Sequence, residues 1–151
     1  MEVWGWLKVW VCVILLIMVW KCTEARADFK PLTRDEPVVR MVLQEGANEP
    51  FAGMVAIAGV AYDRAVDQRW PASVMGVVYE PAQFTGMDLS LRDYSQAQVT
   101  RARLAVVEAY LGTRPCGVVL WYHTDQVYPV WRKRLTVKCQ LGAHIFYGDD
   151  K

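Results

Sequence analysis

The sequence predicts an α+β fold that is mainly helical, with a small antiparallel sheet in its C-terminal third. Residues 37–45 place apolar side chains at helical spacing, and residues 51–65 are apolar almost all round. Residues 135–141 instead alternate apolar and polar side chains, which is the pattern of a half-buried strand. Helices that come before strands, without regular alternation of the two, are typical of α+β folds.

The N-terminus carries much of the apolar excess of this 151-residue chain, which is 54% hydrophobic. Residues 3–20 are apolar apart from Gly5 and Lys8, and Ala25-Arg26-Ala27 matches the A-x-A pattern of a cleavage site. The longest uninterrupted apolar run, residues 9–20, suits the core of an export signal. Residues 3–20 would also span a membrane as a weak anchor, with the Lys8 side chain reaching the interface. We therefore expect residues 1–27 to be a signal peptide or signal-anchor of an exported protein.

The charge balance argues against a nucleic-acid partner. The net charge is +1, and residues 1–27 hold three of the 17 basic and two of the 16 acidic residues. The remaining chain carries 14 of each and is neutral, without the basic footprint of a nucleic-acid binder.

After a polar linker at residues 28–36, a folded domain is predicted over residues 37–151. In its first helix, Val38, Met41, Val42 and Glu45 follow the i, i+3, i+4, i+7 spacing of one helical face. The second helix opens at Pro50 and runs to about residue 65; because it is apolar nearly all round, we expect it to be the buried central helix.

The later elements follow from turn and cap signals. A turn at residues 67–71 leads into a short helix that ends near Tyr79, and a loop then reaches Ser95, a predicted N-cap. The next helix is predicted to end before a C′ glycine, Gly112. Its inward side chains are predicted to be Val99, Ala102, Val106, Ala109 and Tyr110. Strands are predicted at residues 118–122, 135–141 and 145–147.

Glu45 is the candidate acid because a stripe suited to burial ends in its carboxyl group. A carboxyl group that loses water on burial holds its proton more tightly, as a general acid must. The alternative is an ordinary solvated Glu near a helix end.

The residues in this order resemble the cell wall hydrolase family of the spore cortex-lytic enzymes, which is also found in phage lysis proteins. The matching elements are Glu45-Gly46-Ala47-Asn48-Glu49, Gly53, Asp63-Arg64, Trp70-Pro71, Val74 through Pro81, Gln83-Phe84-Thr85, Gly112, Leu120-Trp121-Tyr122, Trp131 and Gly142 through Tyr147. Residues 45–49 depart from the E-A-R-G-E motif usual in the family, and Asp63-Arg64-Ala65 departs from its N-R-V motif. Cys116-Gly117 replaces a common Gly-Gly pair.

The resemblance implies a lysozyme-like α+β fold and cleavage of the glycan strand of peptidoglycan between N-acetylmuramic acid and N-acetylglucosamine. Glu45 would be the catalytic acid. Lytic transglycosylation with a 1,6-anhydro product needs only one carboxyl group, and water-dependent muramidase chemistry is the near alternative. Glu49 lies one helical turn further on, so we expect it to orient the helix junction. A short membrane-targeted phage endolysin fits this organisation, acting in the periplasm or at the inner membrane facing the wall.

Further residues are candidates for substrate binding or support. Gln83 and Thr85 would bond N-acetyl groups or orient Glu45, or simply cap a loop. Trp121 and Tyr122 alternate faces on a strand, so only one of them can line a groove, and Tyr122 is favoured. His123 and His144 would bond substrate or the sheet, and Trp131 would stack on a sugar or fill the core. No ligand spacing predicts a metal or other cofactor.

Cys116 and Cys139 are predicted to form a disulfide, as an exported protein permits. The alternative is a Cys/His amidase or peptidase with Cys116 as nucleophile. A third class is a non-enzymatic wall-binding lysis protein. We expect a monomer whose partners are peptidoglycan and, through residues 3–20, a membrane.

Overall fold

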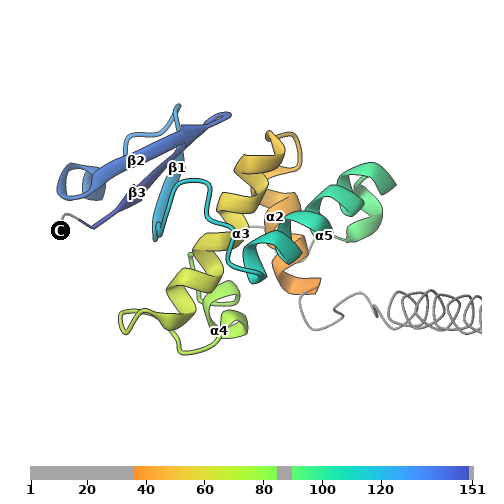
Figure 1. Cartoon of the computed structure of the whole chain (residues 1–151), viewed down its shortest axis with the longest axis horizontal. Helices are drawn as coiled ribbons and strands as arrows, with labels where there is room; N and C mark the ends of the chain where they lie inside the picture. Colours follow the sequence, from red (N-terminus) through yellow and green to blue (C-terminus); the bar gives the residue numbers. More distant parts are fainter. Residues whose placement is uncertain (1–35, 85–89, 150–151) are drawn as a thin grey trace, which may run out of the picture. The chain divides into compact units, whose positions relative to one another are not determined.

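The computed structural model describes residues 36–84 and 90–149 of the chain. The predicted export segment, residues 28–35 of the predicted linker and Thr85 lie outside these ranges. The elements are α2 (Glu36–Gly46), α3 (Phe51–Val66), α4 (Val74–Val78), the 3₁₀ helix η2 (Leu91–Asp93), α5 (Gln96–Tyr110), β1 (Trp121–Thr124), the 3₁₀ helix η3 (Val130–Arg134), β2 (Thr136–Leu141) and β3 (His144–Gly148) (Figure 1). The predicted order of helices before a small sheet is confirmed. Within the described ranges no helix is long and apolar enough to cross a membrane.

α3 is the central helix of the described part. It packs against α2, α4 and α5, and Figure 1 shows it in the middle of the helices. Met54, Ile57 and Val60 are completely buried along it. The prediction of a buried central helix is therefore confirmed, and burial on all sides explains its nearly continuous apolar sequence.

Both predicted ends of α5 are confirmed. The Ser95 hydroxyl accepts a hydrogen bond from the backbone N–H of Gln98, whose side chain accepts one from the N–H of Ser95, so the two form a capping box. At the other end Gly112 adopts φ +95°, and the N–H of Thr113 donates to the carbonyl of Glu108, as in a Schellman motif.

The inward position predicted for Tyr110 is wrong, because 61% of its surface is exposed. It belongs to the last turn of α5, beyond the part of the helix that covers the core. There its ring forms a T-shaped contact with the Tyr62 ring, at a centroid distance of 6.0 Å. The remaining predicted inward residues of α5 are buried.

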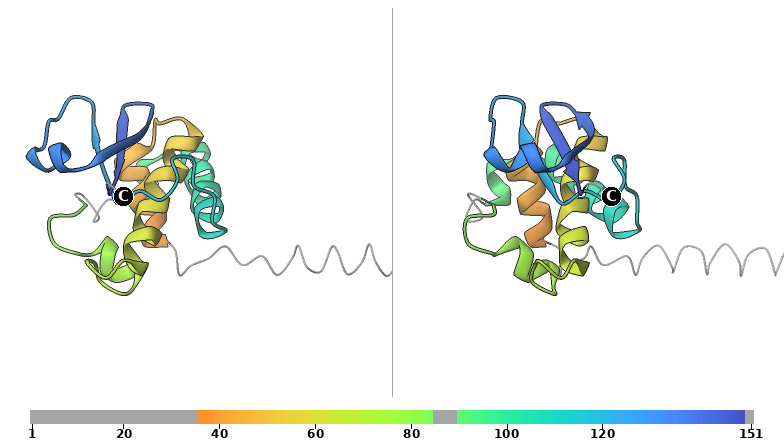
Figure 2. Two further views of the ribbon diagram at one scale, coloured as in Figure 1. Left: turned by 60° about the vertical axis from the view of Figure 1, so that its left-hand side comes forward. Right: turned by 90° about the vertical axis from the view of Figure 1, so that its left-hand side faces the viewer.

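The three strands form an antiparallel sheet in the order β1-β3-β2. The sheet lies beside the helices in Figure 1 and in front of them in the right-hand view of Figure 2. The strand predicted over residues 118–122 begins later than expected, at Trp121. Side chains of α3 bind the preceding backbone instead: Asp63 accepts from the N–H of Val119, and Arg64 donates to the carbonyl of Leu120.

The alternation predicted for residues 135–141 fails at Val137, which is 56% exposed. Val137 pairs with Tyr147, but Cys139 pairs with Phe146, so the register shifts between the two. A β-bulge adds one residue to one strand, and this reverses the face on which the preceding side chains lie. Cys139 and Leu141, which follow the shift, pack against the core as predicted.

Candidate active site

Glu45 lies in the last turn of α2 and is half-buried. Its predicted stripe is present, since Val38, Met41 and Val42 are completely buried. Its carboxylate interacts electrostatically with Arg64 of α3 and Tyr122 of β1. The structure therefore brings Glu45 together with a buried cation and a buried phenol from two other elements.

Arg64 is the centre of this cluster, with only 6% of its surface exposed. Its Nε donates to the carbonyl of Leu120 at 2.8 Å, and its Nη1 donates to Oε1 of Gln83 at 3.3 Å. The Trp70 ring covers the guanidinium, with 4.0 Å between Cζ and the ring centroid. Burial lowers the pKa of Arg64 to about 10, and electrostatic interactions with Tyr122, Glu80 and Glu45 partly oppose this shift. Arg64 is therefore still a cation at neutral pH.

No role was predicted for Arg64, although a signal for it exists in the sequence. Arg64 follows Ile57 and Val60 at i+7 and i+4 on α3, and both of those residues are completely buried. A charged residue on such a stripe must find partners in the interior.

Tyr122 supplies a neutral hydroxyl beside the candidate acid. Burial raises the pKa of this hydroxyl well above its usual 10.0, and the negative charge of Glu45 raises it further. The proton thus stays on Tyr122 at neutral pH and is available to a neighbouring acceptor. Trp121, the neighbour of Tyr122 in β1, lies away from this cluster. Its ring centroid is 4.9 Å from Cζ of Arg69.

Glu49 joins the helices to the sheet. Its carboxylate accepts a hydrogen bond from the N–H of Ala143 at 3.1 Å, and its Oε1 lies 3.2 Å from Nδ1 of His144. Ala143 lies in the turn between β2 and β3, and His144 is the first residue of β3. Gly142 opens this turn with φ +59°, and a Cβ there would collide with the Glu49 carboxylate.

The sheet divides the remaining candidates between its two faces. Tyr122 and His144 lie together, with 5.3 Å between their ring centroids. His123 lies in a second cluster, where its Nε2 is 2.8 Å from the hydroxyl of Tyr147 and its ring meets Trp131 edge-on. Because side chains alternate along a strand, His123 and Trp131 are on the face opposite Tyr122. The structure thus groups Glu45, Gln83 and Tyr122 but separates His123 and Trp131 from them.

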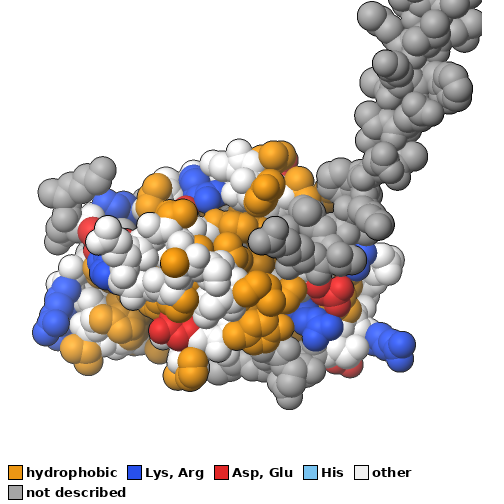
Figure 3. All heavy atoms as spheres, turned by 90° about the horizontal axis from the view of Figure 1, so that it is seen from below, with side chains coloured by type: hydrophobic (Ala, Val, Ile, Leu, Met, Phe, Trp, Pro, Cys, Tyr) orange, Lys and Arg blue, Asp and Glu red, His pale blue; other side chains and the backbone are white. Residues whose placement is uncertain are grey.

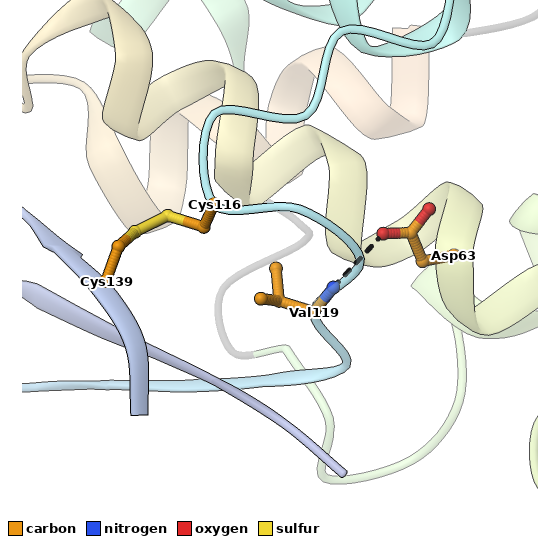
Figure 4. Close-up of a disulfide and its surroundings, with 4 residues drawn as sticks. All are labelled: Asp63, Cys116, Val119 and Cys139. Carbon is orange, nitrogen blue, oxygen red and sulfur yellow. Dashed lines mark hydrogen bonds between the residues drawn. A yellow bond between two sulfur atoms is a disulfide. The ribbon is translucent and has the colours of Figure 1, made fainter. Parts of the chain in front are cut away.

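The segment leading into β1 is fixed at three points. Asp63 accepts from Nε of Arg114 at 2.7 Å. Asp63 also accepts from the N–H of Val119 at 3.4 Å (Figure 4). Cys116 and Cys139 are joined by a disulfide, which connects this segment to β2. A disulfide-bonded sulfur is not a thiolate, so Cys116 does not supply a nucleophile in this state.

Metal ligation has no support in the described ranges, where no three His, Cys, Asp or Glu side chains gather as a candidate site. The side chains of the cluster can themselves transfer protons and donate hydrogen bonds.

Comparisons with known proteins agree with this architecture. The spore cortex-lytic enzyme of Bacillus subtilis is 34% identical over 110 residues, which cover 72% of this chain and 35% of that enzyme. The same enzyme of Oceanobacillus iheyensis is 32% identical over 111 residues, covering 70% of this chain and 38% of that enzyme. The chain thus matches well under half the length of these relatives.

Among solved structures, the catalytic domain of the germination-specific lytic transglycosylase SleB from Bacillus anthracis is similar, with a TM-score of 0.62 and 29% identity over 74% of this chain and 91% of that domain. The catalytic domain of Bacillus cereus SleB is also similar, with a TM-score of 0.61 and 28% identity. The match covers 75% of this chain and 91% of that domain.

The model of the cell wall hydrolase family matches residues 48–147. This segment includes Glu49, Arg64, Gln83 and Tyr122 and begins just after Glu45. The match covers about two thirds of the sequence, and so the chain belongs to the cell wall hydrolase family.

Proposed function

We propose that this chain cleaves the glycan strand of peptidoglycan between N-acetylmuramic acid and N-acetylglucosamine, with Glu45 as the catalytic acid. Family membership and the similarity to lytic transglycosylase domains support the substrate and the reaction. The observation that carries the role of Glu45 is its place at the end of a buried stripe, facing Tyr122 and Arg64. A partly dehydrated carboxyl group beside hydrogen-bond donors suits the delivery and recovery of one proton.

The proposed reaction is a lytic transglycosylation. Glu45 gives its proton to the glycosidic oxygen, and the bond from this oxygen to C1 of the muramic acid breaks. The 6-hydroxyl oxygen of the same sugar bonds to C1, and its proton passes to the Glu45 carboxylate. The products are a 1,6-anhydro sugar end and a free 4-hydroxyl on the leaving sugar, and Glu45 ends protonated as it began.

The position of Glu49 favours a mechanism with one carboxyl group. Two-carboxylate glycosidases hold their second acid across the scissile bond. The Glu49 carboxylate is instead bound to the N–H of Ala143 in the β2–β3 hairpin. Water-dependent muramidase chemistry, with Glu45 activating a water molecule, is the second candidate.

The surface suits a sugar polymer better than a nucleic acid. The face in Figure 3 exposes hydrophobic side chains with separate basic and acidic side chains between them. Exposed Met75 and Tyr79 contribute such apolar surface around α4. Pyranose rings have apolar faces that pack on such side chains, whereas a polyanion needs a continuous basic surface.

We also propose that residues 1–27 export the chain to the wall, as in a membrane-targeted phage endolysin acting in the periplasm or at the inner membrane. The apolar segment 3–20 and the Ala25-Arg26-Ala27 sequence support this. N-terminal sequencing of the protein recovered from cell envelopes tests it. An N-terminus at residue 28 indicates a cleaved signal, an intact one an anchor, and recovery of the chain only from cytosol would contradict export.

Mass spectrometry of the fragments from digested, purified sacculi tests the reaction. Anhydro-muropeptides are the expected product. New reducing ends would indicate the muramidase, free stem peptides an amidase or peptidase, and intact sacculi a non-enzymatic binder. The Cys116→Ser variant, run beside wild type, is expected to release the same anhydro-muropeptides.

A further inference from the structure

A tight turn places two polar side chains at Arg64. The N–H of Gln83 donates to the carbonyl of Glu80 at 3.2 Å, which closes the turn, and Ala82 within it adopts φ +63°. Gln83 accepts a hydrogen bond from Arg64. The Glu80 carboxylate also interacts with the Arg64 charge, and its Oε2 is buried without a hydrogen-bond partner. The turn thus holds a carboxylate with one buried oxygen close to Arg64, a cation that acts on Glu45.

Charged and titratable groups reach this cluster from several elements. Glu45 comes from α2, Arg64 from α3, Glu80 from the turn after α4, and Tyr122, which is neutral, from β1.

Other charged groups on these elements have partners of their own. Arg40, also on α2, is paired with Glu36 at 3.0 Å. On the side of the β2–β3 hairpin, Oε1 of Glu49 lies 3.2 Å from Nδ1 of His144.

Arg64 by itself works against a general acid. A cation near a carboxyl group favours the ionised form, so an uncompensated Arg64 would remove the proton that Glu45 must deliver. A second carboxylate near Arg64 has the opposite effect on Glu45. Its negative charge offsets the field of the guanidinium and so disfavours ionisation of the neighbouring acid.

We propose that Glu80 is a positioning residue that balances the charge of Arg64 and so allows Glu45 to hold its proton at the pH of the reaction. This inference rests on the proposed role of Glu45 as the acid. Glu80 itself transfers no proton to substrate. Its function requires only a negative charge held beside Arg64 by the turn from Glu80 to Gln83.

The Glu80→Gln variant keeps the shape of the side chain and removes the charge. The alkaline fall of its pH–rate profile on sacculi should move to lower pH by about one unit, while the rate at its own optimum stays within several-fold of wild type. Glu80→Asp should restore most of the shift. Glu108→Gln, an equal loss of charge at an exposed position of α5, should leave the profile unchanged.

A second measurement follows Glu45 without any activity. Carbon-13 NMR of carboxyl-labelled glutamate gives the titration midpoint of Glu45, assigned by the signal missing from Glu45→Gln. The midpoint should fall by about one pH unit in Glu80→Gln and stay fixed in Glu108→Gln. Far-UV circular dichroism of each variant establishes that it is folded.

The outcomes separate this inference from the proposed function. If Glu45→Gln abolishes cleavage but Glu80→Gln changes neither the profile nor the midpoint, only the role of Glu80 is overturned. A loss of more than a hundredfold at every pH in folded Glu80→Gln would also overturn it, because Glu80 would then act in the chemistry itself. If Glu45→Gln retains activity while the midpoint still falls in Glu80→Gln, the charge balance stands and the proposed acid does not.

Discussion

The Nε of Arg64 donates a hydrogen bond to the carbonyl oxygen of Leu120 over 2.8 Å, two residues before Tyr122. The preceding residue of α3, Asp63, accepts from the N–H of Val119. Two consecutive residues of the central helix therefore bind two consecutive residues ahead of β1. Helix and strand are held together where Tyr122 meets Glu45, so the geometry of the candidate site depends on this pair of contacts.

Arg64→Lys tests how much the site depends on the guanidinium. Lysine keeps the charge but lacks the planar fork that reaches both Leu120 and Gln83. We expect the free energy of unfolding in urea to fall by about 2 kcal/mol, with slower sacculus digestion. Arg103→Lys, on the exposed side of α5, should change neither value. Equal stability of the two variants would show that the Leu120 contact contributes little.

Gly142→Ala tests the connection between Glu49 and the hairpin. Gly142 and Gly117 both have positive φ, at +59° and +71°, but only at Gly142 would a Cβ collide with other atoms, those of Glu49 and Pro50. Gly117→Ala should cost about 1 kcal/mol of unfolding free energy from backbone strain alone. Gly142→Ala should cost about 2–3 kcal/mol, because Glu49 must also give up its hydrogen bond to Ala143. Matching losses in the two variants would contradict the importance of this contact.

Ala82→Gly should stabilise the protein. Ala82 has φ +63°, a conformation that alanine adopts at a cost and glycine adopts freely. We expect a gain of roughly 0.5–1 kcal/mol in thermal unfolding. Ala72→Gly, at an exposed loop position without positive φ, should be neutral or destabilising, since it only adds freedom to the unfolded chain. Destabilisation by Ala82→Gly would show that this turn is not strained.

The disulfide should contribute to stability mainly by restricting the unfolded chain. Cys116 and Cys139 are 23 residues apart, and closing a loop of this length is worth about 3 kcal/mol. The double variant Cys116→Ser, Cys139→Ser should lose roughly this amount in urea unfolding. Dithiothreitol should lower the stability of wild type and leave the double variant unchanged. An equal effect of the reductant on both proteins would contradict the assignment.

Local patterns in the sequence predicted much of the fold, because their causes are local. Ser95 and Gly112 mark the two ends of α5 through hydrogen bonds to residues one turn away. The exposure of Val137 could not be predicted, since the bulge in β2 depends on pairing with β3. Tyr122 and Trp121 have different neighbours, His144 and Arg69, as alternation along a strand predicts, and the role of Tyr122 in lining a groove stays a prediction.

The candidate site was only partly predictable, because its residues are distant in sequence. Glu45 and Tyr122 were identified as candidates, but their contact depends on Arg64, which donates to Leu120 across 56 positions. The grouping of His123 with Trp131, apart from Glu45, likewise follows from the return of the chain after β1. Spacing along one helix or strand carries no information about such contacts.

The most direct measurement of the central claim is the rate at which Glu45→Gln releases muropeptides from purified sacculi. Glu36→Gln, which changes a half-buried acid at the start of the same helix, is the matched control. If Glu45 delivers the proton, its amide variant should be slower by at least about a hundredfold while remaining folded, and Glu36→Gln should match wild type. Release of anhydro-muropeptides by Glu45→Gln at the wild-type rate would contradict the account.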